Sequence, residues 1–183
     1  MPPATHVALI RGINVGGHNI VPMAQLRESL AARGLDGVRT YIQSGNVLFG
    51  APGLGEIAAA EAVEAVLAED FSVDTVVVAA AADSLRAVIA TAPAGFGGEP
   101  DLYHYDVAFL RPGVSSEEAR AAFGIREGID TAWAGERAVY FRRLSAQRTK
   151  SRMSTVMATP FYRVMTIRNW RTTTRLAQML DEH

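Results

Sequence analysis

A segment rich in glycine and proline, from Pro93 to Pro100, interrupts all hydrophobic periodicity near the middle of the 183-residue chain. Such a segment is typical of a linker. On each side of it the apolar pattern predicts the same order of elements, β-α-β-β-α-β followed by a helix, which is the order of ferredoxin-like units. We therefore predict an α+β protein of two ferredoxin-like subdomains, residues 1–95 and 96–183, related by internal duplication. One continuous mixed sheet has the same element order and is the alternative.

The predicted elements follow from periodicity and from the residues that begin and end helices. Pro22 suits a first helical position, Gly34 suits a helix end, and Pro160 stops a helix. In the first half we expect strands over 6–11, 38–43, 46–50 and 73–79, and helices over 22–33, 56–70 and 83–91. In the second half we expect strands over 102–111, 128–133, 137–142 and 162–167, and helices over 115–123, 147–158 and 172–182.

Composition excludes several classes of protein. The apolar content of 49% and charged content of 20% are globular values. The absence of cysteine excludes disulfides, thiolate metal sites and cysteine nucleophiles, and it fits a reducing compartment. The longest apolar run, Val76 to Ala82, is too short for a membrane span, and the N-terminus lacks the pattern of a secretory signal. The cytoplasm is therefore the expected location.

The most specific chemical hint is a glycine-rich turn, Gly12 to Gly17, between the first strand and the first helix. Its glycine spacing fits a P-loop, but His18 and Asn19 replace the lysine and the hydroxyl that such a loop needs. A nucleotide-hydrolysing loop is therefore excluded. The flexible backbone still allows an anion-binding loop with Arg11, Asn14, Gly16, Gly17 and His18. The simpler interpretation is a loop whose glycines serve turning and close packing.

Two further segments carry candidate ligand-binding residues. Ser44 and Asn46 stand in a predicted hairpin turn that the strand order brings close to the glycine turn, although a tight turn alone explains them. Arg168 and Asn169 follow a predicted strand, and with Trp170 they form a candidate ligand contact. The alternative is that Asn169 or Thr172 caps the last helix and that Trp170 packs in the core.

Charge is distributed unevenly along the chain. Ten basic residues and no acidic one lie between residues 137 and 180, whereas the first 136 residues carry 17 acidic and eight basic residues. A basic, aromatic-rich segment suits nucleic-acid binding through the Arg137–Arg175 surface. The sequence pI of about 6.4 argues against it, and charge complementarity between the two halves explains the asymmetry equally well.

Three motifs lie in order along the chain: the runs from Leu9 to Gly17, from Val38 to Val47 and from Thr166 to Trp170, with the sequences LIRGINVGG, VRTYIQSGNV and TIRNW. With these motifs the chain resembles a bacterial family known as Domain of Unknown Function 1697. The resemblance implies a small α+β protein with two ferredoxin-like subdomains. It implies no activity and no site residues, and Arg171 departs from the asparagine that often follows the tryptophan.

The leading hypothesis is a protein without a recognisable catalytic constellation that binds a small anionic ligand at the Gly12–Gly17 loop. The four histidines lack metal-ligand spacing, so neither a metal nor a cofactor is expected. A nucleic-acid-binding module or a protein-interaction module are the alternatives, with no membrane association and with a monomer or a weak homodimer as the expected state.

Overall fold

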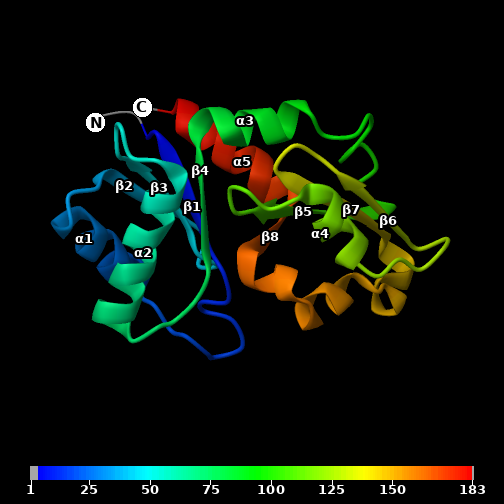
Figure 1. Cartoon of the computed structure of the whole chain (residues 1–183), viewed down its shortest axis with the longest axis horizontal. Coiled ribbons are helices and arrows are strands. Elements are labelled where there is room, and N and C mark those ends of the chain that lie inside the picture. Colours follow the sequence, from blue (N-terminus) through cyan, green and yellow to red (C-terminus); the bar gives the residue numbers. More distant parts are fainter. Residues whose placement is uncertain (1–3, 183) are drawn as a thin grey trace. The chain divides into compact units, whose positions relative to one another are not determined.

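The computed structural model describes residues 4–182, which divide into two compact units (Figure 1). The first unit comprises residues 4–86 together with 175–182, and the second comprises residues 87–174. Two helices, α3 (Ala82–Ala90) and α5 (Trp170–Asp181), each contribute to both units. The boundary that the sequence predicts, between residues 95 and 96, lies within the second of these units.

The first unit contains a four-stranded antiparallel sheet. Its elements follow the order β1 (His6–Ile10), α1 (Met23–Ala32), β2 (Asp36–Tyr41), β3 (Asn46–Gly50), α2 (Glu56–Phe71) and β4 (Val77–Ala81). The strand order in the sheet is β2-β3-β1-β4. In register, Ala8 of β1 pairs with Val47 of β3 and with Ala79 of β4.

The core of the first unit lies between one face of this sheet and the two helices α1 and α2 (Figure 1). Side chains alternate along a strand, so Ala8 and Ile10 reach this face together with Phe49. Leu26 and Leu30 of α1 are four positions apart on one helix face and are fully buried. Each such leucine contributes about 1.5–3 kcal/mol by burial.

The second unit contains another four-stranded antiparallel sheet. Its elements are β5 (Tyr103–Leu110), α4 (Ser116–Ala122), β6 (Asp130–Ala134), β7 (Ala138–Leu144), three short 3₁₀ helices and β8 (Met165–Asn169). The strand order is β6-β7-β5-β8. Ser115 is the N-cap of α4, because its hydroxyl accepts a hydrogen bond from the Glu118 N–H.

The helix predicted over residues 147–158 is wrong. The chain instead forms 3₁₀ helices over Ser145–Lys150, Met153–Ala158 and Pro160–Val164. Hydroxyl side chains compete with helical bonding here, because Thr155 donates to the Arg152 carbonyl and Thr159 donates to the Val156 carbonyl. Serine and threonine also have modest helix propensity, so the apolar spacing alone did not determine the outcome.

The predicted α+β class is confirmed, since the described chain combines two antiparallel sheets with helices. Within residues 4–182 we find no helix that is both long and apolar enough to cross a membrane. In the same range, histidine and carboxylate side chains form no group of three that suits a metal ion.

Candidate functional site

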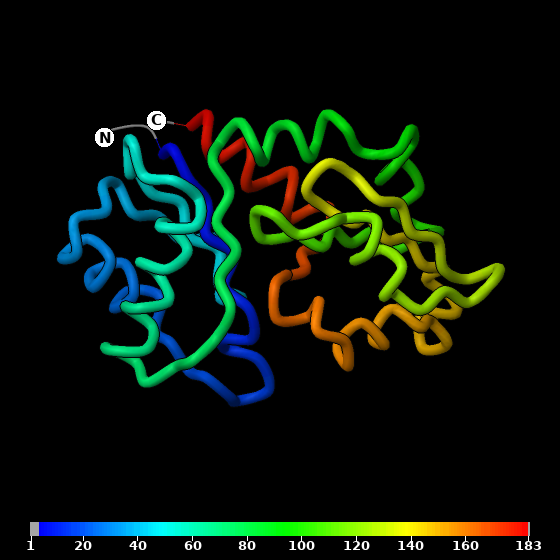
Figure 2. Tube along the Cα trace, viewed as in Figure 1, coloured from blue at the N-terminus to red at the C-terminus, as the bar shows by residue number. Residues whose placement is uncertain are grey.

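The glycine turn is the tip of a long excursion that the chain makes between β1 and α1 (Figure 2). His18 N–H donates to the Val15 carbonyl at 3.0 Å, which closes a tight turn. Its two central residues, Gly16 and Gly17, have φ of 58° and 77°. Positive φ at both central positions is the requirement of a type I′ turn, and glycine meets it without steric cost. Both glycines and His18 are exposed.

Asn14 ties this loop to two other parts of the first unit. Its side-chain oxygen accepts from the Val21 N–H at 2.8 Å, and its Nδ2 donates to the carbonyls of Val21 and Gln43, each at 2.9 Å. Asn14 also has φ of 55°, a conformation that asparagine tolerates better than most residues. These bonds use the oxygen and both amide hydrogens, so Asn14 serves the loop structure.

The β2–β3 turn packs directly against the start of the glycine loop. The Ile10 N–H donates to the Gly45 carbonyl at 2.8 Å. A Cβ at Gly45 would lie 2.9 Å from the Ile10 Cβ and 3.0 Å from the Ile13 Cγ1, so glycine is required. Asn46 is fully buried and donates to the Tyr41 carbonyl at 3.0 Å and to the Ser44 hydroxyl at 3.3 Å. The two loops thus lie together, but most of their polar side chains bond to their own chain.

Arg11 and Gly12 are also bound into the loop structure. The Arg11 N–H donates to the Val76 carbonyl, and the Arg11 carbonyl accepts from the Thr75 hydroxyl at 2.6 Å. The Gly12 carbonyl accepts from the Asn19 side chain at 3.2 Å. Among the predicted loop residues, Gly16, Gly17 and His18 therefore present the most accessible groups.

The other two predicted site residues, Arg168 and Asn169, belong to the second unit. Arg168 is 9% exposed and donates to the Thr166 hydroxyl and to the Ile167 carbonyl. Burial lowers the pKa of Arg168 to about 10, which still leaves it charged at neutral pH. Asn169 is the N-cap of α5, because its Oδ1 accepts from the Thr172 N–H at 2.7 Å.

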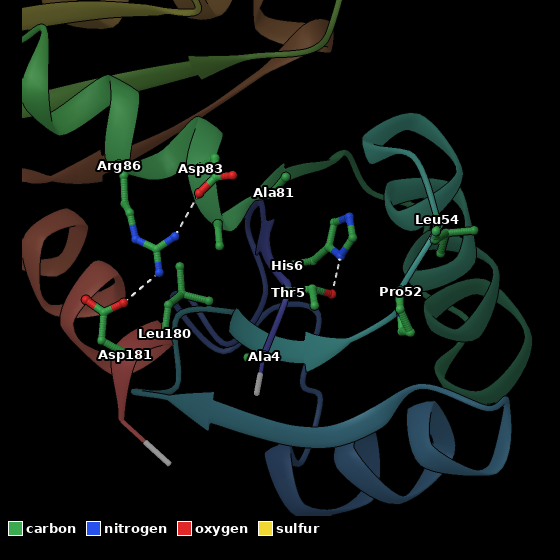
Figure 3. Close-up of a pocket in the computed structure, with 12 residues that line it drawn as sticks. Ala4, Thr5, His6, Pro52, Leu54, Ala81, Asp83, Arg86, Leu180 and Asp181 are labelled. Carbon is green, nitrogen blue, oxygen red and sulfur yellow. Dashed lines mark hydrogen bonds and ion pairs between the residues drawn. The ribbon is translucent and has the colours of Figure 1, made fainter. Parts of the chain in front are cut away.

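A hollow of about 680 Å³ lies in the first unit at the end of β1 that is remote from the glycine loop (Figure 3). Arg86 bonds both Asp83, at 2.9 Å, and Asp181, at 2.6 Å. The Thr5 hydroxyl lies 2.8 Å from Nδ1 of His6, and it also accepts from the Ala51 N–H. The charged groups of this hollow therefore satisfy one another.

A second hollow, of about 550 Å³, lies in the second unit at the start of α5. We call it the α5 hollow. Aromatic, basic and amide side chains line it, and none of its lining residues is acidic. The lining residues are Gly97, Pro100, Tyr103, His104, Tyr105, Asn169, Trp170, Arg171 and Thr174.

Several donors in the α5 hollow have no partner among the residues that the structure describes. The Arg171 guanidinium forms no hydrogen bond or ion pair with any residue in the range 4–182. The same described range offers no hydrogen bond to Nδ2 of Asn169, to the His104 ring or to the Tyr103 hydroxyl. Arginine and amide N–H groups donate only. Their natural complement is a group rich in acceptor oxygens.

The aromatic wall of the α5 hollow is held rigidly. The indole of Trp170 packs against Gly97, where an added Cβ would lie 2.3 Å from two indole atoms. Phe96 meets the same indole edge to face, with ring centroids 5.1 Å apart. Trp170 thus packs against Gly97 and Phe96 and also lines the hollow.

Buried polar atoms in the second unit are less well satisfied than those in the first. In the described part of the chain, the buried side-chain atoms without a hydrogen-bond partner are Asp106 Oδ2, Asp130 Oδ1, Arg142 Nε and Arg143 Nε. Asp106 lies 3.1 Å from the Arg143 guanidinium, an ion pair by distance without hydrogen-bond geometry. Burial raises the pKa of Asp106, and the positive charge of Arg143 opposes that rise.

Sequence reasoning missed Gly97, Tyr103, His104 and Arg171 as site residues. Tyr103 and His104 begin an ordinary strand, and Gly97 lies in a segment whose glycine content indicates only a linker. The available signal was the TIRNW motif, in which Asn169 and Trp170 directly precede Arg171.

Residues 4–140 match the family described as "Protein of unknown function (DUF1697)". The match spans most of the chain, so the protein belongs to this family. The chain is also similar to a solved structure, described as that of the conserved bacterial protein SP0830 from Streptococcus pneumoniae. The two share 28% identity with a TM-score of 0.78, over 97% of this chain and 98% of the other. A comparison with curated proteins found no match.

Proposed function

We propose that this protein binds a small anionic ligand in the α5 hollow. The observation that carries the proposal is a set of donors, above all Arg171, that have no partner among residues 4–182 and that lie in a concave site with no acidic lining residue. A pocket of several hundred Å³ with a few convergent polar groups is typical of a small-molecule site. The start of α5 adds the positive end of a helix dipole.

Arg171 is the residue best suited to hold the anionic group. It is exposed, and a guanidinium binds carboxylates and phosphates with two parallel hydrogen bonds. Asn169 adds an amide donor from the preceding position, while its Oδ1 remains committed to the helix cap. The leading hypothesis from the sequence, an anionic ligand, is thus kept, but its site moves from the glycine loop to the third motif.

Thermal shift tests the proposal with inorganic phosphate, ribose 5-phosphate, citrate and adenosine monophosphate at constant ionic strength. We expect at least one of them to raise the Tm of the wild type and to raise that of Arg171→Gln less. The affinity of that anion for Arg171→Gln should fall about tenfold, or about 1.4 kcal/mol. Arg175→Gln is the matched control, since it removes the same charge from the same helix, where Arg175 is paired with Glu182.

If none of these anions raises the Tm, or if one raises it equally in the wild type and in Arg171→Gln, the proposal fails. An equal loss in Arg171→Gln and Arg175→Gln would also contradict it. That result would indicate a general effect of charge rather than a site.

The glycine loop remains a second candidate for anion binding. In the described chain, the N–H groups of Gly16 and Gly17 form no hydrogen bond, and both residues are exposed beside His18. An anion bound there should raise the Tm of His18→Ala less than that of the wild type. It should raise the Tm of Arg171→Gln as much as that of the wild type. The opposite pattern would favour the α5 hollow.

Nucleic-acid binding is supported by one feature of the second unit. The segment of 3₁₀ helices presents four exposed basic residues, Arg148, Lys150, Arg152 and Arg163. Binding through them should weaken steeply as salt rises, because phosphate contacts release counterions. A mobility-shift experiment that shows no complex at low ionic strength would remove this candidate.

The two units have features that support a ferredoxin-like fold and an origin by duplication. In each sheet the order is second, third, first and fourth strand of that unit, with antiparallel neighbours throughout. An experimental structure in which the two sheets superpose strand for strand would support this proposal. A different strand order in either unit would contradict it.

A further inference from the structure

The aromatic side of the α5 hollow bears on the kind of anion that the site accepts. Arg142 lies over the ring of Tyr103, with its guanidinium carbon 4.2 Å from the ring centroid. The same carbon lies 5.5 Å from the centroid of Trp133. Arg142 thus covers one face of the Tyr103 ring, while Tyr103 also lines the hollow.

This arrangement fixes the orientation of Tyr103 before any ligand arrives. A guanidinium stacked on an aromatic face is attracted to the ring, and the attraction is stronger where the pair is withdrawn from water. Tyr105 meets Tyr103 at a steep angle, with centroids 6.2 Å apart. The hydroxyl of Tyr105 accepts from the Glu99 N–H at 3.3 Å, so Tyr105 is itself anchored.

Trp170 forms another flat wall and is fixed from a different direction. Gly97 contacts its indole along the pyrrole edge, and Phe96 meets it at 90°. Side chains that are already ordered lose little conformational entropy when a ligand stacks on them. Rigid aromatic surfaces are therefore well suited to bind a flat ring.

We infer that the ligand of the α5 hollow is an aromatic anion, in which a planar ring carries a phosphate or carboxylate. The inference rests on the proposed function, because Arg171 holds the anionic group. The ring stacks on Tyr103, on the face opposite Arg142, or on the indole of Trp170. Aromatic pairs gain free energy beyond that of buried area, and a saturated ring of similar size gains only the area term.

Three phosphates that differ only in their substituent test the inference by titration calorimetry. Phenyl phosphate presents a flat ring, cyclohexyl phosphate presents a saturated ring of similar size, and inorganic phosphate presents the anion alone. We expect phenyl phosphate to bind about tenfold more tightly than cyclohexyl phosphate, and both to bind more tightly than inorganic phosphate. All measurements use the full chain at one ionic strength.

Two substitutions of Tyr103 separate stacking from structure. Tyr103→Leu removes the ring and should reduce the preference for phenyl over cyclohexyl phosphate to about twofold or less. Tyr103→Phe keeps the ring beneath Arg142 and should retain the preference. If Tyr103→Leu folds poorly, the comparison of phenyl and cyclohexyl phosphate on the wild type still tests the inference.

The outcomes distinguish this inference from the proposed function. Equal binding of phenyl and cyclohexyl phosphate overturns the aromatic ligand and leaves an anion site at Arg171. An aromatic preference that persists in Tyr103→Leu and is lost in Trp170→Leu assigns the stacking to the indole and supports the inference. A wild type that binds none of the three phosphates contradicts both the inference and the proposed function.

Discussion

In the first unit, the candidate side chains of Asn14 and Asn46 bond to their own chain, and the charged groups of the first hollow pair with one another. In the second unit, the α5 hollow collects donors without hydrogen-bond partners in the described chain. The buried polar atoms that lack such partners in residues 4–182 also belong to the second unit.

This difference shows that polar residues in a motif can have one of two roles, holding loops together or contacting a ligand. Asn14, Gly45 and Asn46 are specified because the glycine loop and the β2–β3 turn must interlock. Within residues 4–182 Arg171 makes no such contact, and an exposed donor in a concave place is available to a ligand. We therefore expect the loop motifs to govern stability and the α5 hollow to govern binding.

The largest effect is expected from Gly45→Ala. The added methyl would lie within 3.0 Å of the Ile10 backbone oxygen and 2.9 Å of its Cβ, at a φ of 86°. Overpacking and left-handed strain together should lower the free energy of unfolding by about 3–4 kcal/mol. Urea denaturation measures it, with Gly53→Ala as the control, where φ is 82° and nothing lies within 4 Å. Equal losses in the two variants would show that the interlock is not tight.

Gly97→Ala should affect both stability and binding. Its methyl would overlap the Trp170 indole, at a φ of 84°. We expect a loss of about 2–3 kcal/mol in stability, because a side chain yields more readily than backbone. The affinity for phenyl phosphate should fall as well. Gly113→Ala, with the same φ and open space, should lose about 1 kcal/mol and bind normally. If Gly97→Ala binds phenyl phosphate as tightly as the wild type does, Trp170 is not part of the site.

Asn14→Ala should destabilise the protein by about 2 kcal/mol without changing anion affinity. The variant leaves the Val21 N–H and the Gln43 carbonyl without their side-chain partner. Thermal unfolding and calorimetry on the same sample measure the two quantities. Asn19→Ala, which loses one longer bond to the Gly12 carbonyl, should cost less than 1 kcal/mol. A stable Asn14→Ala variant that has lost anion binding would indicate that the anion binds at the glycine loop.

The smallest effect concerns the pH dependence that Asp106 gives to stability. Burial raises the pKa of this carboxyl in the folded state, so its contribution is full below the ordinary value for aspartate and is lost as pH rises through the raised value. Relative to Asp106→Asn, the wild type should therefore lose stability as pH increases from about 4 to 7. Urea denaturation across that range measures the difference in the free energy of unfolding between the two proteins. Asp101→Asn is the control, because Asp101 is exposed. Parallel profiles, or a gain with rising pH, would contradict the assignment.

Much of the fold could be predicted because its signals are local. The strand from His6 and the helices near residues 22–33 and 56–70 follow from periodicity and from residues that begin or end elements. The segment 145–164 could not be predicted in this way, since its apolar spacing is helical while its hydroxyl side chains bond to nearby carbonyls. Which of these tendencies prevails depends on tertiary packing.

The site was less predictable than the fold. The sequence indicated correctly that the glycine turn and the Ser44–Asn46 turn would be neighbours. It could not show that the Asn14 side chain donates its hydrogen bonds to the carbonyls of Val21 and Gln43. The α5 hollow joins residues from a linker, the start of a strand and the start of a helix, separated by about seventy positions. Such a grouping is defined only by the folded chain.

The central claim is that an aromatic anion binds at the α5 hollow and not at the glycine loop. The most direct test is a titration of the ¹⁵N-labelled protein with phenyl phosphate, followed by NMR. The chain has two tryptophans, so Trp133→Phe assigns both indole N–H signals. We expect a saturable shift of the Trp170 indole signal, with the amides of Gly16 and Gly17 unmoved. Saturable shifts of Gly16 and Gly17 with a stationary Trp170 signal would contradict it.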